Sequence, residues 1–204
     1  GLTFGNILRA MLRQAPNIVL IGEIRDQEVA EIAIQAALTG HLVFSTLHTN
    51  DAPSSITRLI DMGVKPFLVA SSIQAIMAQR LVRVLAEDCK EPDPDPDPRF
   101  LQLCGISEEE AERHTIYRAG RSPANPTGFR GRLGIFEMMK MNSEMREIAF
   151  KRGSIAELRD AARRHGMTTL IEDGKKKILR GITTPQEIAR FAQTEELLEA
   201  NIDL

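Results

Sequence analysis

The chain contains few aromatic residues and few cysteines. Of its 204 residues none is tryptophan and one is tyrosine, and aromatic residues make up 4% of the composition. We therefore do not expect a surface that binds nucleic acid by stacking bases on aromatic rings. Two cysteines, Cys89 and Cys104, are too few for a disulfide framework. They fit a protein of a reducing, cytoplasmic compartment.

A strong net charge and a long hydrophobic run are also lacking. The formal net charge is -2, which gives no bulk attraction to nucleic acid or to an anionic membrane. The longest apolar stretches are about 5 to 7 residues, whereas a membrane-spanning helix needs about 20. Residues 1–4 have neither the basic start nor the apolar run of a secretory signal. We therefore expect neither a transmembrane protein nor a secreted mini-protein.

The remaining composition is that of a globular protein, with 43% hydrophobic and 26% charged residues. A short run over residues 17–24 is rich in β-branched residues and shows no alternation, which predicts a strand buried on both faces, as in a parallel sheet. Asp26 is a good N-cap for a helix that continues to Thr39 and is apolar almost all round. Residues 41–48 predict a second buried strand. Strand, helix and strand in this order form a βαβ unit with parallel strands, so the expected fold class is α/β.

Further helices are expected on both sides of this unit. Apolar residues recur at helical spacing over residues 4–13, and Pro16 closes that helix. Residues 53–62 and 66–85 predict two more helices, each with proline near its first turn.

The composition changes after residue 85. Residues 91–98 alternate acidic residues with proline, which predicts an extended, solvated spacer. Residues 129–139 predict a strand, and the chain is expected to be helical from Asn142 to its end. Capping boxes mark two of these helices, namely Ser154 with Glu157 and Thr184 with Glu187. The expected domains are 1–85, 86–128 and 129–204.

Polar residues follow both predicted strands. Glu23 and Arg25 come directly after the first strand, and His48 ends the second. In open α/β sheets ligands bind at the carboxyl ends of the strands, so these side chains are expected at one edge. A carboxylate there can hold a magnesium-bound water or orient an attacking one, and an imidazole can donate to a phosphate. Taken singly, Glu23 and Arg25 also fit a plain ion pair, and His48 fits a structural histidine.

These segments resemble the secretion and pilus-assembly ATPases of the type II secretion and type IV pilus systems. Residues 17–26 resemble their Walker B segment, and residues 39–51 resemble their histidine box, with His41 and His48 on its two histidines. The resemblance extends to residues 2–16, to Gln79-Arg80-Leu81-Val82-Arg83 as the helix that ends the ATPase core, and to two tail segments, 128–137 and 173–184. It therefore covers nearly the whole chain and implies the second half of a RecA-like core, followed by a small subdomain and a helical tail.

The resemblance also implies roles for individual residues. Glu23 takes the Walker B role, positioning magnesium and the lytic water, while His48 and His41 couple the γ-phosphate of ATP to domain movement. Arg25 and Arg80 join a charge network at the nucleotide or the subunit boundary. The implied assembly is a homo-hexamer on the cytoplasmic face of the inner membrane that acts on platform proteins of the machine, with no nucleic-acid partner.

The sequence lacks a phosphate-binding loop. Such a loop reads Gly-x-x-x-x-Gly-Lys-Ser/Thr, but at the only Gly-Lys, Gly174-Lys175, the residue five places earlier is Thr169 and the next is Lys176. The family pattern enters part-way through the ATPase core, so we expect a carboxyl-terminal fragment that by itself neither binds ATP tightly nor hydrolyses it. The alternative is a non-catalytic ring or adaptor module that docks partners of the machine.

Zinc is not expected either, although many family members carry two Cys-x-x-Cys pairs between the core and the strand at residue 129. Tetrahedral thiolates at that spacing hold a structural zinc. Here the four positions are Ala86, Cys89, Arg121 and Ala124, so one ligand remains. Cys104 lies among apolar residues and fits a small buried hydrophobe. A substitute set of Cys89, Cys104 and His114 is the remaining alternative.

Two further expectations concern surfaces. The basic runs 163–164 and 175–177 fit a solvated helix face, with contact between subunits as the alternative. Half of a parallel sheet leaves an unpaired strand edge and an uncovered apolar face. The isolated chain is therefore expected to self-associate or to be only marginally stable.

Overall fold

A computed structural model describes residues 1–200, with side chains as far as residue 192. These residues form two compact units. The first combines Gly1–Ala78 with Met138–Met167, and the second combines Gln79–Glu137 with the chain from Thr168 onward. No helix among the described residues is both long and apolar enough to cross a bilayer.

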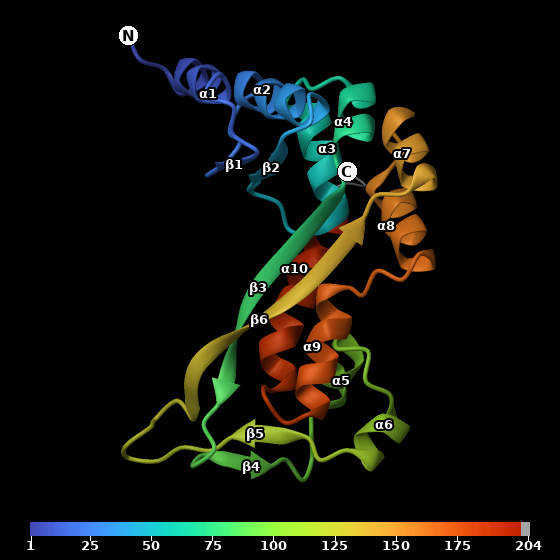
Figure 1. Cartoon of the computed structure of the whole chain (residues 1–204). Coiled ribbons are helices and arrows are strands. Elements are labelled where there is room, and N and C mark those ends of the chain that lie inside the picture. Colours follow the sequence, from blue (N-terminus) through green and yellow to red (C-terminus); the bar gives the residue numbers. More distant parts are fainter. Residues whose placement is uncertain (201–204) are drawn as a thin grey trace. The chain divides into compact units, whose positions relative to one another are not determined.

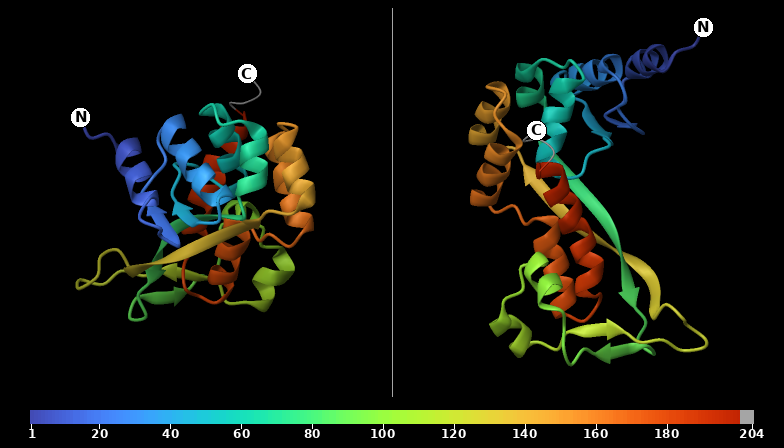
Figure 2. Two further views of the ribbon diagram at one scale, coloured as in Figure 1. Left: turned by 45° about the horizontal axis from the view of Figure 1, so that its top comes forward. Right: turned by 180° about the vertical axis from the view of Figure 1, so that it is seen from behind.

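The first unit contains the predicted βαβ element. Strand β1 (Ile18–Ile21) is followed by helix α2 (Gln27–Leu38) and strand β2 (Leu42–Ser45). The two strands are parallel, with Ile18 opposite Leu42 and Leu20 opposite Phe44, which confirms the predicted topology and the α/β fold class. Helix α1 (Phe4–Leu12) precedes β1, as expected. Figure 1 and Figure 2 show α1 and α2 on the same side of the strand pair.

The prediction that both strands are buried on both faces is wrong. In β1 buried and exposed residues alternate, so Val19 and Ile21 pack with Leu8, Val29 and Ile32. The opposite face is exposed because α1 and α2 both cover the same side of the pair. Its side chains are apolar, and they are 63%, 74%, 51% and 52% exposed at Ile18, Leu20, Leu42 and Phe44. The predicted uncovered apolar face is therefore present.

Four more helices complete the first unit. They are α3 (Ala52–Asp61), α4 (Pro66–Ser72), α7 (Ser143–Phe150) and α8 (Ile155–Arg164). Helix α4 packs against α2, α3 and α7, while α8 packs against α3 and α7. Fully buried side chains at the centre of this helical cluster come from these helices and from the turn between α3 and α4, namely Ile56, Val64, Val69, Met145 and Leu158.

The predicted helix over residues 66–85 is wrong beyond Ser72. Helix α4 ends there, and Ala75–Leu85 form strand β3, including the segment Gln79-Arg80-Leu81-Val82-Arg83 that was expected to be helical. The segment forms a strand because exposed and more buried residues alternate along it with a period of two. Met77, Gln79 and Leu81 are exposed, whereas Ala78 and Val82 are buried. Strand β3 pairs with β6 (Phe129–Lys140), which confirms the strand predicted over residues 129–139.

The second unit is built on most of β3 and β6. It adds the short antiparallel pair β4 (Lys90–Pro92) and β5 (Tyr117–Ala119), and the helices α5 (Pro98–Leu103), α6 (Glu108–Arg113), α9 (Leu170–Leu179) and α10 (Pro185–Ala200). Helix α10 packs against α9 and α5. The helical tail is confirmed as far as residue 200, while the last four residues of that prediction lie outside the described part of the chain.

The two predicted capping boxes have different outcomes. At the start of α8, the Ser154 hydroxyl accepts from the Glu157 amide and the Glu157 carboxylate accepts in return, so this box is confirmed. At the start of α10, the Thr184 hydroxyl accepts from the Glu187 amide at 3.4 Å. The Glu187 carboxylate is instead bonded to Arg83, with 2.6 Å to the guanidinium and 3.2 Å to the backbone amide.

Candidate functional site

The candidate site lies at the carboxyl edge of the parallel strand pair. Pairing continues beyond the strands, because the Ile24 amide donates to the Thr46 carbonyl at 3.0 Å and the Thr46 hydroxyl donates to the Gly22 carbonyl at 2.6 Å. These bonds hold the segments after β1 and β2 side by side. The two chain segments that carry Glu23 and His48 therefore meet at one edge, as a parallel pair requires.

Glu23 is held between the Arg25 guanidinium and the His48 imidazole. One carboxylate oxygen lies 2.5 Å from the Arg25 guanidinium, and the other lies 3.1 Å from Nε2 of His48. The hydrogen bond from Arg25, followed by that from His48, lowers the pKa of Glu23 against a smaller opposing effect of burial. Glu23 is therefore ionised at neutral pH. The ion pair that Glu23 and Arg25 were expected to form on the simpler interpretation is present, and His48 joins it.

The three side chains differ in exposure. Glu23 is one-third exposed, whereas Arg25 and His48 are 73% and 85% exposed. A largely exposed imidazole is not fixed by packing around its ring. Its position therefore depends on Glu23 and on the backbone of the turn that carries it.

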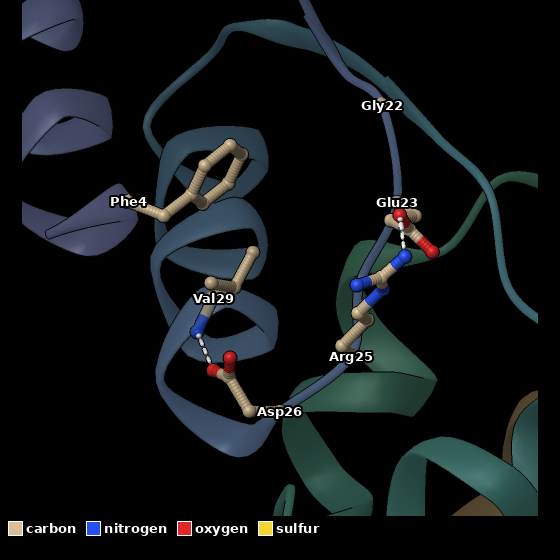
Figure 3. A pocket seen from close by; sticks show the side chains of 6 residues that line it. All are labelled: Phe4, Gly22, Glu23, Arg25, Asp26 and Val29. Atoms are coloured by element: carbon tan, nitrogen blue, oxygen red, sulfur yellow. Dashed lines mark hydrogen bonds and ion pairs between the residues drawn. The ribbon is translucent and has the colours of Figure 1, made fainter.

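An open pocket of about 320 Å³ lies beside Glu23. Figure 3 shows Phe4 and Val29 on one side of it and Gly22, Glu23 and Arg25 on the other. Asp26 lies at its base, where its carboxylate accepts from the Val29 amide at 2.9 Å and caps α2, as the sequence predicted. A Cβ added at Gly22 would meet no atom within 4 Å, so the backbone there is open to a ligand.

The structure does not bring His41 to this edge. His41 precedes β2, so it lies at the other end of a four-residue strand, roughly 13 Å away at about 3.3 Å per residue. Its Nδ1 is 3.1 Å from the Ala36 carbonyl and 3.2 Å from the Thr39 hydroxyl, at the end of α2. Arg80 lies on β3 in the second unit, and its guanidinium donates to the Gln79 carbonyl at 3.1 Å. The roles expected for His41 and Arg80 stay predictions.

One buried group near the edge was missed by the sequence analysis. The Asp51 carboxylate accepts from the Ser54 amide at 2.7 Å, which caps α3, and lies 2.7 Å from the Arg159 guanidinium. A polar residue before Ala52-Pro53 is a recognisable N-cap signal. The partner of Asp51 had no such signal, because Arg159 is 108 residues further along the chain.

The four positions that correspond to the paired cysteines do not form a zinc site. Cys89 is buried and its Sγ lies 3.7 Å from the Ser122 hydroxyl, while Ala86 and Ala124 offer no ligand atom. The turn that follows the second pair of positions, Arg121 and Ala124, is held by hydrogen bonds of Asn125. Its Oδ1 accepts from the Gly128 amide and its Nδ2 donates to the Phe129 carbonyl. One thiol does not fit a tetrahedral thiolate site.

Cys104 is buried as expected, and its thiol donates to the Pro185 carbonyl. Burial raises its pKa to about 12, so the thiolate that zinc requires is disfavoured. Within the described residues no three His, Cys, Asp or Glu side chains lie close enough together to hold a metal.

Two of the three lysines in the basic run 175–177 form ion pairs. Lys175 lies 2.6 Å from Glu110, and Lys177 lies 2.6 Å from Asp173, while Lys176 is exposed. Asp173 also accepts from the Phe136 amide at 2.9 Å, which ties α9 to β6. Asp173 therefore has a structural role, in which it joins α9 to β6 and pairs with Lys177.

Comparison with known proteins places the chain in a family. Residues 1–190 match the family model of the type II/IV secretion system protein. A type IV pilus assembly ATPase PilB from Thermus thermophilus is 48% identical over 189 residues, which are 92% of this chain and 21% of that protein. A type II secretion system protein E from Pseudomonas aeruginosa is 47% identical over 195 residues, 95% of this chain and 38% of the relative. The chain thus spans about a fifth to two fifths of the length of these relatives.

Solved structures show the same fold. The crystal structure of the pilus retraction motor PilT with bound ADP matches with a TM-score of 0.64 and 24% identity, over 93% of this chain and 43% of that one. The ATPase DotB of Legionella pneumophila matches with a TM-score of 0.60 and 22% identity, over 98% of this chain and 42% of that one. The family model matches nearly the whole chain, and the two relatives are 48% and 47% identical to it, so the chain belongs to the type II/IV secretion system protein family.

Proposed function

We propose that this chain is part of an ATP-hydrolysing motor subunit that powers type II secretion or type IV pilus assembly. The observation that carries the proposal is the contact between Glu23 and His48 at the carboxyl edge of two parallel strands. Relatives named as a pilus assembly ATPase and as a type II secretion system protein, 48% and 47% identical to the chain, support it.

Glu23 takes the role of the carboxylate that holds a magnesium-bound water and orients the attacking water. Its lowered pKa keeps it ionised, and the adjoining pocket gives a ligand access. Magnesium in phosphoryl-transfer sites keeps several waters and binds through one or two carboxylates plus the substrate phosphates. Glu23 fits as one such carboxylate. When bound, the ion neutralises charge that develops on the phosphate oxygens.

His48 takes the role of the group that registers the γ-phosphate. The His48 ring is hydrogen-bonded to Glu23, and an imidazole can exchange that acceptor for a phosphate oxygen. Such an exchange would couple the state of the nucleotide to the turn that follows His48. Arg25 keeps the other oxygen of Glu23 paired, while Arg80 and His41 are proposed members of the wider network.

The remaining parts of the motor are proposed to come from outside these 204 residues. The sequence has no Gly-x-x-x-x-Gly-Lys-Ser/Thr, so the phosphate-binding loop must be supplied elsewhere, and we expect the chain alone to be inactive. The proposed assembly is a homo-hexamer at the cytoplasmic face of the inner membrane, bound to platform proteins of the machine.

The test uses the longer protein that contains this chain. Glu23→Gln keeps the shape of the side chain and removes its charge, so the rate of phosphate release should fall by about 10²- to 10⁴-fold while ATP binding persists. Arg164→Met, on the exposed side of α8, is the matched control and should leave the rate unchanged. A wild-type protein that binds its partners but hydrolyses no ATP would contradict the proposal and favour the adaptor alternative.

A further inference from the structure

The turn that follows His48 is built around Asp51. The Thr49 hydroxyl donates to the Asp51 carbonyl at 3.1 Å and lies 2.9 Å from the Ser55 hydroxyl. One oxygen of the Asp51 carboxylate caps α3 through the Ser54 amide at 2.7 Å. The segment from Thr49 to the start of α3 is therefore held by hydrogen bonds to Asp51 and to Ser55.

The Asp51 side chain is only 6% exposed, so its charge needs a partner. Its second oxygen lies 2.7 Å from the Arg159 guanidinium, which is 27% exposed and projects from α8. Both residues belong to the first compact unit, in which α3 and α8 pack together. A buried carboxylate that loses such a partner is strongly disfavoured and moves towards water where the backbone allows.

We propose that Arg159 is a positioning residue for His48, and that α8 acts through Asp51 on how His48 meets Glu23. This inference rests on the proposed function. His48 is 85% exposed, so packing around its ring does not place it, and its position depends on Glu23 and on the turn that ends at Asp51. The linked groups run from Glu23 through His48 and the turn to Asp51 and Arg159. Any displacement of α8 relative to α3 would thereby reach the catalytic edge.

A neighbouring ion pair on the same helix provides a matched control. Arg164 pairs with Glu144 of α7, and these two side chains are 58% and 42% exposed. The pair links α7 to α8 and makes no contact with the turn after His48 among the contacts of the described residues. Removing Arg164 therefore deletes an exposed ion pair of α8 and leaves the contacts of Asp51 in place.

Four variants separate positioning from general stability. Arg159→Met removes the partner of Asp51, and Asp51→Asn removes the charge while keeping a good N-cap for α3. Arg159→Lys restores a cation, although without the planar fork of arginine. Arg164→Met is the control. Each is measured in the full-length protein by the NMR resonances of the His48 ring and by hydrogen exchange of the Ser54 amide.

The rate of ATP hydrolysis of the same full-length variants is then measured over a range of ATP concentrations. Arg159→Met and Asp51→Asn should both shift the His48 resonances and lower kcat by about 10- to 100-fold, with KM for ATP nearly unchanged. Arg159→Lys should recover most of the rate, and Arg164→Met should match the wild type.

Two results overturn the inference: His48 resonances and kcat that are unchanged in Arg159→Met, or equal losses in Arg159→Met and Arg164→Met. Failure of the proposed function is distinguished by Glu23→Gln. If Glu23→Gln hydrolyses ATP at the wild-type rate, the proposed function fails, and the His48 resonances alone decide whether Arg159 positions that ring.

Discussion

The uncovered face of the β1–β2 pair gives a quantitative prediction for the isolated chain. Ile18, Leu20, Leu42 and Phe44 lie on this face and are 51–74% exposed. Full burial of such a side chain contributes about 1.5–3 kcal/mol, so each has roughly 1–1.5 kcal/mol left to gain. Two copies that pack this face together would gain about 8–12 kcal/mol, against an association cost of about 4–15 kcal/mol. With a cost at the lower end of that range, the net gain is about 4–8 kcal/mol, so we expect self-association with a Kd in the micromolar to millimolar range.

The perturbation is the double substitution Leu20→Lys with Phe44→Lys, at positions that pair across the two strands. It removes about half of the apolar gain in each copy and places charges in the contact. Association should weaken at least about 100-fold, since each 1.4 kcal/mol corresponds to a factor of ten. Phe150→Lys is the control, because Phe150 is 60% exposed on α7 and away from this face.

Sedimentation velocity measures the effect over a concentration series from about 5 to about 500 µM. The wild type and Phe150→Lys should associate with increasing concentration, while the double variant stays monomeric. A wild-type chain that remains monomeric throughout, or a double variant that associates as strongly as the wild type, would refute the reasoning.

Three further predictions concern the second unit. Glu187→Gln should lower its free energy of unfolding by roughly 2 kcal/mol, because the carboxylate is 6% exposed but its partner Arg83 is 39% exposed, which screens part of the pair. Burial raises the pKa of Glu187, but the hydrogen bonds from Arg83 outweigh it and leave the pKa lowered. The stabilisation is therefore present above the unfolded-state pKa of about 4.3 and is lost as the pH falls through the lower folded-state pKa. The free energies of unfolding of wild type and variant, measured by chemical denaturation, should converge at low pH, and a difference that stays the same at every pH would count against this. Cys104, whose thiol pKa is raised to about 12, should resist alkylation at pH 8 until the chain unfolds, as followed by mass spectrometry. Protein purified without added metal should carry far less than one zinc per chain and melt at the same temperature with and without a chelator; stoichiometric zinc would show that Cys89 has partners that the structure does not bring to it.

The topology of the βαβ unit was predictable because two short apolar runs and the helix between them leave few alternatives. The exposure of one face of the two strands was not predictable from the sequence. Hydrophobicity shows that Ile18 and Leu20 favour burial, but it does not show which faces the neighbouring elements cover, and α1 and α2 both cover one side. The helix predicted to extend to Leu85 failed for a related reason. The helix that begins at Pro66 was predicted to continue through residues 75–85, which form a strand. The partner of that strand, β6, lies some fifty residues further along the chain.

The candidate site shows the same division between local and distant signals. Glu23 and His48 were predicted to meet because parallel strands bring their carboxyl ends together, and their side chains do lie in contact. Asp51 carries a local N-cap signal, but its ion pair with Arg159 joins residues 108 positions apart and leaves no pattern in a single sequence. Lys175 and Lys177 were expected to be solvated, yet acidic residues of α6 and α9 pair with them.

The central claim is that Glu23 and His48 act together in ATP hydrolysis, and a double-mutant cycle in the full-length protein tests it most directly. Initial rates of magnesium-dependent phosphate release are compared for the wild type, Glu23→Gln, His48→Ala and the double variant. Residues that act as a unit are non-additive, so the double variant should be scarcely slower than Glu23→Gln alone. Losses that multiply, or a Glu23→Gln variant that hydrolyses ATP at the wild-type rate, would contradict the account.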